Sequence, residues 1–419
     1  MRILSSVVLA AAAASAVLGQ GPQKCSSLHT RRSAHSLSTD EWRKIGRVLA
    51  QMHDSGELDR FAGAHQALFE SVHGSTTFFP FHRKFVQEFE DVGRRIDGTF
   101  FVPYWDSTRD YRDPARSPIL RNTTLGGNGQ GPDGCLQDGI QGGWTMGFPG
   151  DHCLRRQFDD GSAIEPWVPA EVISSYIQSD DAIAQFREHI EYGIHGAVHL
   201  GLGGDAATRF APNDFFFFMH HANIDRLWWL WQNTHRMMDY NGPGTNGEAS
   251  LDDVIPHTDN MDFGDARAGS VMVLGFNRMC FAYDSAPAPP AQYPGANSDD
   301  HRMIHDARLP APVFSGSSDT AGLGLEIMRI RRALAGSAAL KDDFPGVAAL
   351  GAARGIDADV DADACTCQER RAKRLVYPAP MSEMWIRMHG FDRARVDGVH
   401  REACALIDRL NNSTYVSPY

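Results

Sequence analysis

The stretch DFFFFMHHANIDRLW, residues 214–228, predicts a buried helix that carries two adjacent histidines. Asn213 or Asp214 can cap its start, because their side chains accept hydrogen bonds from the free N–H groups of a first turn. The stretch is apolar on nearly every side, which is typical of a helix in the core. His220 and His221 are therefore expected to point into the interior or close to it.

Upstream of this stretch, Glu191, His195 and His199 follow one another at four-residue intervals. This spacing predicts that the three side chains project from the same face of one helix. Apolar residues at three- and four-residue steps predict an adjoining buried stripe, made by Ile183, Phe186, Ile190 and Ile194.

Another histidine group lies nearer the N-terminus, with His65, His73 and His82 eight and nine residues apart. His82 ends the stretch FFPFH, in which Pro80 can open a helix because the N–H that proline lacks would be unpaired there. His82 is then expected to project from the first turn of that helix.

Six buried imidazoles without partners would leave ring nitrogens unpaired, at a cost of about 1–3 kcal/mol each. Metal coordination would satisfy them, so the two groups predict metal binding. They supply neutral rings and no carboxylate of the kind that offsets two divalent ions, which favours a pair of copper ions. A two-zinc hydrolase is the alternative. The other histidines, His389 among them, are expected to be ordinary hydrogen-bonded side chains.

The composition excludes some classes of protein. The 419 residues are 42% hydrophobic, enough for a large core, so wholesale disorder is excluded. The net charge is −12 and no long basic run appears, so nucleic acid is not an expected partner. Arg2 and the apolar run to Leu18 predict a signal peptide, and hence a secreted protein. That run is short for a membrane anchor and no second one follows, so no membrane association is expected.

We expect four regions along the chain. They are a signal peptide (1–19), a catalytic domain (20–284), a proline-rich linker (285–297) and a C-terminal extension (298–419). Within the extension, residues 325–334 and 398–410 are predicted to be helical. Basic pairs that end at Arg371 and Arg374 are candidate cleavage sites, although a basic surface patch is the more frequent explanation of such runs.

Seven cysteines in an exported chain favour disulfides, three at most. Cys135 and Cys153 are the pair we expect first, whereas Cys365 and Cys367 are expected to bond to different partners. Sequons at Asn122 and Asn412 are candidate glycosylation sites.

The motifs together resemble the tyrosinase and catechol oxidase (polyphenol oxidase) family of binuclear type 3 copper proteins, in a secreted, fungal-like short form. The matching segments are His73 with FFPFHR (78–83), PYWD (103–106), HGAVH (195–199) and HHANIDRLW (220–228). They span most of residues 36–284, and their combination is highly specific.

The resemblance implies a mainly α fold, with a central four-helix bundle that holds two copper ions, long loops, and a smaller helical C-terminal extension. The ligands it implies are His65, His73 and His82 for one copper, and His195, His199 and His221 for the other. His220 is then only a neighbour of the second site. CFAY, residues 280–283, looks like a variant of the tyrosine motif that closes the domain, and Arg31 or Arg32 is expected to stack on Tyr283.

The implied activity is the oxidation of small phenolic substrates by dioxygen: o-diphenols give o-quinones, and monophenols are hydroxylated more weakly. Glu191 matches a position that orients a water molecule able to accept a phenol proton, with a helix-surface carboxylate as the alternative. Gly196 stands where efficient monophenol hydroxylases often have Asn. Leu200 would form an apolar rim, and Thr208 corresponds to a gate above the second copper or to a loop residue that points away.

Other features leave alternatives open. Ser71 stands where many relatives have a cysteine, so a thioether crosslink to histidine is not implied here. Asp225 is expected either to orient a ligand imidazole or to pair with an arginine. A dioxygen carrier of the haemocyanin type, without substrate turnover, is the alternative function. We also expect the C-terminal extension to restrict access to the metals, with a purely stabilising role as the alternative.

Overall fold

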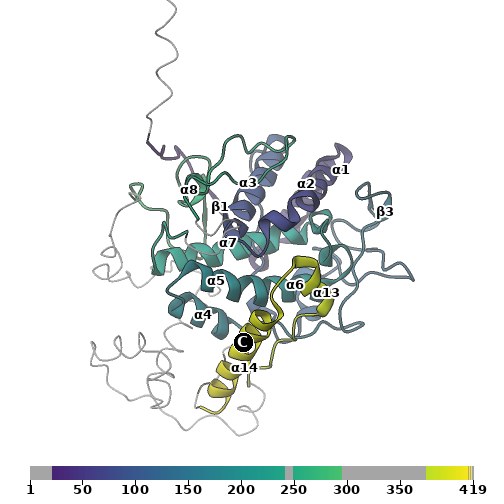
Figure 1. The fold of residues 1–419 in the computed structure, drawn as a ribbon. Helices are drawn as coiled ribbons and strands as arrows, with labels where there is room; N and C mark the ends of the chain where they lie inside the picture. Colours follow the sequence, from purple (N-terminus) through teal and green to yellow (C-terminus); the bar gives the residue numbers. More distant parts are fainter. Residues whose placement is uncertain (1–20, 241–248, 295–373, 414, 416, 418–419) are drawn as a thin grey trace, which may run out of the picture.

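The structure is a computed structural model and describes residues 21–240, 249–294, 374–413, 415 and 417. The described chain is mainly helical (Figure 1), which confirms the predicted fold class. In Figure 1, α7 runs through the middle of the molecule, with α1–α3 on one side and α4–α6 on the other. The predicted signal peptide lies outside the described residues.

The helices have the following bounds: α1 Thr39–Asp54, α2 Glu57–Val72, α3 Phe78–Ile96, α4 Ala170–Ser179, α5 Ile183–Ile190, a π-helical turn Glu191–His195, α6 Gly196–Leu202, α7 Phe216–Thr234, α8 Ala268–Val271, α13 Glu383–His389 and α14 Arg393–Asn411. Two short sheets accompany them: β1 His29–Arg31 pairs in parallel with β4 Phe281–Tyr283, and β2 Thr145–Met146 pairs antiparallel with β3 His152–Cys153. Single 3-10 turns interrupt the long loops.

Phenylalanine rings hold the central helices together. Phe89 of α3 stacks on Phe218 of α7 with ring centroids 3.5 Å apart. Phe61 of α2 meets both of these rings edge-on, at 5.1 and 5.6 Å. α7 is buried along nearly its whole length, as its apolar sequence predicts.

The N-cap of α7 is Phe215 and not the predicted Asn213 or Asp214, because the helix begins only at Phe216. Asp214 Oδ1 accepts a hydrogen bond from the Phe216 N–H at 3.0 Å. Both carboxylate oxygens of Asp214 also accept from Arg156, at 2.6 and 2.8 Å. Asp214 therefore fixes the helix start and is itself held by a buried arginine.

The prediction of one continuous helix through Glu191, His195 and His199 was wrong. α5 ends at Ile190, and a π-helical turn follows in which Gly193 has φ −108° and ψ −105°. A π-helical turn is wider than an α-helical one, so residues four apart no longer share a face across it. Glu191 and His195 can therefore point to different places.

The N-terminal segment is tied to the end of the domain. β1 pairs with β4, and a Cys25–Cys280 disulfide, which the sequence did not predict, joins the same two segments. Arg31 is the arginine at the tyrosine motif: it donates to the Tyr283 hydroxyl at 3.1 Å, and its guanidinium lies 5.8 Å from the centre of the Tyr283 ring and 3.5 Å from that of the Phe281 ring. The predicted Cys135–Cys153 disulfide is confirmed.

The described part of the predicted linker, residues 285–294, lies against the domain. Trp229 Nε1 donates to the Pro287 carbonyl at 2.8 Å, and the Tyr293 hydroxyl donates to the Gly269 carbonyl at 2.8 Å. This part of the linker is therefore packed against the domain and is not a free spacer.

Residues 374–417, as far as they are described, are called the tail here. The tail contains α13 and α14 and lies against α4 and the α5–α6 segment (Figure 1). The predicted helix at 398–410 is confirmed within α14, whereas the predicted helix at 325–334, Cys365 and Cys367 lie outside the described residues. Among the helices that the structure describes, none has the length and apolarity to span a bilayer.

Candidate metal centre

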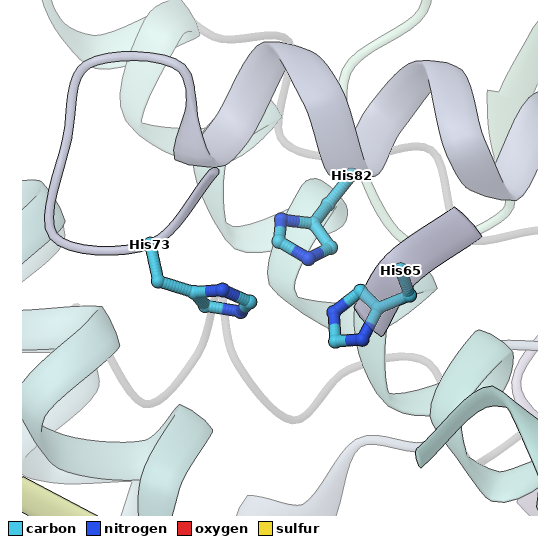
Figure 2. A group of neighbouring side chains, drawn as sticks. All are labelled: His65, His73 and His82. Atoms are coloured by element: carbon cyan, nitrogen blue, oxygen red, sulfur yellow. The ribbon is translucent and has the colours of Figure 1, made fainter. Parts of the chain in front are cut away.

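The first histidine triad converges from three consecutive segments (Figure 2). His65 comes from α2, His73 from the residue that follows α2, and His82 from the N-terminal part of α3. Each ring offers a nitrogen, and these three nitrogens all lie within 4.8 Å of one another. All three side chains are buried.

Backbone carbonyls orient these rings. The Nδ1 atoms of His65, His73 and His82 contact the carbonyls of Arg209, Phe69 and Phe78 at 2.7, 2.9 and 2.8 Å. A carbonyl can only accept, so each Nδ1 carries the proton and donates it. Each Nε2 is thereby left as a bare lone pair, the form in which a neutral imidazole binds a metal.

The second triad comes from the other side of the bundle. His195 ends the π-helical turn, His199 lies on α6 and His221 on α7, and their candidate ligand nitrogens also lie within 4.8 Å of one another. His199 Nδ1 donates to the Ala206 carbonyl at 2.6 Å, which frees its Nε2. His220 is buried beside this triad, with its ring 5.1 Å from that of His199.

The two triads adjoin. The rings of His82 and His221 stack with centroids 4.1 Å apart, and those of His73 and His195 are 5.8 Å apart. Two ions held by the triads would therefore be close neighbours.

Most ring nitrogens of the triads that point away from the backbone lack a partner in the part of the chain that the structure describes. Among the described residues, Nε2 of His65, His82 and His199 and both ring nitrogens of His195 and His221 have no hydrogen-bond partner. Burial lowers the pKa of His65 to about 4 and that of His199 to about 3, so the rings are neutral at ordinary pH. Six neutral nitrogen donors without a carboxylate in either group suit copper, and the donor set fits two such ions.

A buried arginine fixes the relation between the two triads. Arg83, next to His82, pairs with Asp225, one turn after His221 on α7. It also donates to the carbonyls of Val271 and Met272 at 3.0 and 2.9 Å. Of the two alternatives for Asp225, the structure shows the pairing with an arginine; its other oxygen accepts from the Tyr283 hydroxyl at 2.6 Å.

Glu191 is fully buried, unlike a surface carboxylate. Its Oε1 accepts from the N–H of Gly74, the residue after His73, at 2.6 Å. Its Oε2 accepts from Arg187 at 2.6 Å. Burial raises the pKa of Glu191 to about 7, against the opposing charge of Arg187. Glu191 thus connects the segment before the second triad with the loop of the first.

The tail covers the triads, and the side chains that do so were not singled out in the sequence. The Trp385 ring lies 5.3 Å from that of His199, and the His389 ring lies 5.0 Å from that of His73 and 4.6 Å from that of Phe69. The Nδ1 of His389 donates to the Trp385 carbonyl at 3.0 Å, so His389 is hydrogen-bonded as expected, but its place beside the first triad was not predicted. A Trp and a His one turn apart, after the helix-capping Ser382, were the available signal.

The remaining predicted site residues lie near this cover. A Cβ added to Gly196 would come within 2.5 Å of Met381 Cε and 3.0 Å of Trp385 Nε1. Leu200 packs against an apolar cluster that joins the domain and the tail, made by Tyr192, Trp385, Ile386, Phe391, Val396 and Val399. Thr208 donates its hydroxyl hydrogen to the Asp205 carbonyl at 2.7 Å, in a local turn. Its role as a gate stays a prediction.

Two neighbouring, buried three-histidine groups on helices are positioned to bind two metal ions. Residues 55–234 match the family model for the common central domain of tyrosinase. The chain is 32% identical over 251 residues to the tyrosinase of Streptomyces antibioticus, and the alignment covers 54% of this chain and 91% of that protein. It is 31% identical over 312 residues to the tyrosinase-like protein phomQ1 of Diaporthe leptostromiformis, covering 63% of this chain and 79% of that one.

The chain belongs to the tyrosinase family and is an oxidoreductase, as the resemblance of its motifs predicted. Among solved structures, the polyphenol oxidase of Thermothelomyces thermophila is similar, with a TM-score of 0.49 and 22% identity over 61% of this chain and 88% of that one. The tyrosinase of Burkholderia thailandensis has a TM-score of 0.44 and 16% identity, over 64% of this chain and 75% of that one.

Proposed function

We propose that this protein is a copper-dependent polyphenol oxidase that oxidises o-diphenols well and hydroxylates monophenols slowly. The observation that carries the proposal is the pair of adjoining triads, in which five Nε2 atoms are buried without a hydrogen-bond partner among the described residues: those of His65, His82, His195, His199 and His221. His65, His73 and His82 would hold one copper ion, and His195, His199 and His221 the other. Bound copper would supply dioxygen binding and accept the electrons of the phenol.

The reaction proposed for o-diphenols balances without another reactant. Two o-diphenols each lose two electrons and two protons and become o-quinones, while one dioxygen takes up all four of each and becomes two waters. The protein has to exclude bulk water, hold the rings of the ligands in place and admit a flat aromatic substrate. The burial of all six histidines supports the first task, and the carbonyl-fixed rings and the buried Arg83–Asp225 pair support the second.

Monophenols need a further group, because a phenol must lose its proton before it binds as an anion. We assign this role to Glu191 acting through a water molecule, supported by its burial and by its place beside the loop of His73. General-base assistance is typically worth about 10²–10⁴-fold. Gly196 offers no side-chain amide to hold that water, so the hydroxylation is proposed to be slow.

We propose that the tail keeps the full chain in a low-activity state. Trp385 and His389 lie against rings of both triads, and Met381 fills the space that the missing side chain of Gly196 leaves. A phenol could not lie against these imidazoles while residues 381–389 of the tail are docked, so turnover by the full chain requires that this segment move aside. The stabilising role that is the alternative would leave the rate unchanged when the tail is displaced.

The covered centre is also what favours the second candidate, a dioxygen carrier. Dioxygen is small enough to reach buried metals that a phenol cannot reach. A carrier would show oxygen-induced near-ultraviolet absorption and no oxidation of catechol, with the tail docked or displaced.

The deciding experiment combines metal analysis with oxygen uptake. Protein produced with copper should contain two copper ions per chain, absorb in the near ultraviolet after addition of dioxygen, and consume oxygen with catechol. Two zinc ions and no oxygen uptake would indicate the hydrolase instead. Absence of catechol oxidation after displacement of the tail would reject the oxidase.

We also propose that the protein is secreted. The Cys25–Cys280 and Cys135–Cys153 disulfides favour an oxidising compartment. Sequencing the N-terminus of protein recovered from the culture medium tests this, since cleavage near residue 19 is expected. Mass spectrometry of the same sample would show whether Asn122 and Asn412 carry glycans.

A further inference from the structure

Arg187 is a buried arginine beside the candidate metal centre to which the resemblance assigns no role. It lies on α5, one turn before Glu191, with 3% of its side chain exposed. Its Nη1 donates to Glu191 Oε2 at 2.6 Å, and its Nη2 donates to Glu188 Oε1 at 3.4 Å. One guanidinium is thus shared, unequally, between two carboxylates.

The shorter of these contacts fixes the carboxylate of Glu191 together with the N–H of Gly74. Each of its two oxygens then accepts one hydrogen bond from the protein and keeps a lone pair for one more donor, such as a water molecule. A buried carboxylate without a cationic partner tends to take up a proton, because burial disfavours its charged form. A protonated Glu191 could not accept the proton of a phenol.

The partner in the longer contact, Glu188, also contacts the tail. Glu188 Oε1 also accepts from Arg395 of α14 at 2.7 Å, the shorter of its two contacts with arginine. Glu188 is 20% exposed and Arg395 58% exposed, so this pair lies at the edge of the docked tail. Without Arg395, Arg187 would be the remaining arginine partner of Glu188 among the described residues, and the carboxylate of Glu188 would draw the guanidinium away from Glu191.

We propose that Arg187 is the positioning residue that holds the Glu191 carboxylate charged and oriented, and that Arg395 of the tail keeps Glu188 from competing for it. This inference rests on the proposed function, because it concerns the step in which a monophenol loses its proton. Arg187 touches no reacting atom and acts only through Glu191.

The test uses the full chain with copper bound and measures kcat/KM for a monophenol and for the matching o-diphenol. The ratio of the two values cancels any change in access caused by movement of the tail. Arg187→Met should lower this ratio at least about tenfold, since part of a general-base contribution of about 10²–10⁴-fold is lost. Arg187→Lys keeps the charge and should restore most of the ratio.

Arg395 provides the sharper half of the test, because its replacement leaves the core intact. Arg395→Gln should lower the ratio about two- to fivefold, in keeping with the modest strength of an exposed ion pair. Arg393→Gln is the matched control: Arg393 lies on the same helix and pairs with Asp397 and Glu383, all within the tail. It should leave the ratio unchanged.

A double variant tests the route through Glu188. In a Glu188→Gln background the competing charge is gone, so Arg395→Gln should have no further effect on the ratio. Equal losses of monophenol and diphenol turnover in Arg187→Met and Arg187→Lys, or an Arg395→Gln ratio equal to that of the wild type, would overturn the inference. Wild-type protein that turns over neither phenol even after displacement of the tail would instead reject the proposed function itself.

Discussion

At position 196 the chain has no side chain, and the tail occupies the space. Gly196 directly follows His195, and a Cβ there would approach Met381 Cε to 2.5 Å and Trp385 Nε1 to 3.0 Å. The missing side chain of Gly196 has two consequences. No amide is available to hold a water molecule, and the tail can approach the triads closely.

Gly196→Asn should therefore raise the rate of the full chain with both catechol and a monophenol, because the larger side chain pushes the tail outward. The catechol rate of the full chain measures this effect. Gly143→Asn is the control, since Gly143 is exposed and has a positive φ of 76° that Asn tolerates, and no described residue lies near its Cβ position. An unchanged catechol rate in Gly196→Asn would contradict the contact with the tail.

The same variant separates access from chemistry. The ratio of monophenol to diphenol turnover should rise as well if the amide holds the water that Glu191 orients. A raised catechol rate with an unchanged ratio would mean that only the tail moved. If wild-type protein hydroxylates tyrosine as fast as it oxidises catechol, residues other than Gly196 determine the ratio of the two activities. Leu200 and Thr208 are then the next residues to change.

Single ligand changes test the metal centre itself. His82→Ala and His221→Ala, one from each triad, should each reduce oxygen uptake with catechol to background, because two adjoining metals are required. Copper analysis should show less than two ions per chain in both. His53→Ala is the control, since His53 lies at the surface and contacts the Thr145 carbonyl at 2.8 Å. Full activity in either triad variant would exclude that histidine as a required ligand.

At the scale of elements, the docked tail is held by an apolar cluster and by polar contacts at its edges. Tyr192 packs on Phe391 with ring centroids 4.5 Å apart, and His189 contacts Glu402 of α14 at 3.1 Å. Against this, Trp385 Nε1 and His389 Nε2 are buried without a hydrogen-bond partner in the part of the chain that is described. Each such atom costs about 1–3 kcal/mol, so docking is weaker than the apolar contacts alone would make it.

Docking of the tail should depend on pH through His189. Burial lowers the pKa of His189, but its contacts with Asp180 at 2.7 Å and with Glu402 outweigh burial, so the pKa is raised. His189 also stacks on Tyr176. A raised pKa means that the contribution is complete below the ordinary value of about 6.5 and is lost as the pH rises through the higher value.

The catechol rate of His189→Gln relative to wild type measures this dependence. At pH 6 the variant should be the faster of the two, by no more than about fivefold, because Glu402 is exposed and such pairs are worth about 1 kcal/mol or less. The difference should vanish in alkaline buffer. A constant ratio across this range would show that the protonation of His189 does not affect docking.

The sequence predicted the elements that carry strong local signals and missed those fixed by tertiary contacts. α7 and the histidine spacings were readable because burial and periodicity act within one segment. The break at Gly193 was not, since a glycine in a helical pattern gives no sign that the backbone will widen there. α13 was missed because its seven residues are too short for a periodic pattern, and its partners lie on α6 and α2.

At the scale of the whole molecule, the two disulfides differ in the length of chain they close. Cys25–Cys280 spans 255 residues, and Cys135–Cys153 spans 18. Sequence spacing indicated only the short one, because a long-range pair depends on how β1 and β4 come together. The longer loop loses more entropy of the unfolded chain on closure.

Removal of each disulfide by paired Cys→Ser changes should therefore have unequal effects. Loss of Cys25–Cys280 should lower the free energy of unfolding by about 2–5 kcal/mol, and loss of Cys135–Cys153 by somewhat less. Chemical denaturation of the oxidised proteins, with the m-value checked for constancy, measures both. A larger loss for the short loop would show that local packing, rather than chain entropy, dominates.

The position of Arg374 has a kinetic consequence. Arg374 is exposed, and the helices that cover the triads all follow it in the chain. A protease that cuts there leaves those helices bound by non-covalent contacts alone, so a tethered, intramolecular association becomes a bimolecular one. Activation of the cut protein should then depend on dilution: it should be slow or incomplete in a concentrated sample and complete in a dilute one. The released C-terminal peptide, added back, should act as a titratable inhibitor of the enzyme that produced it.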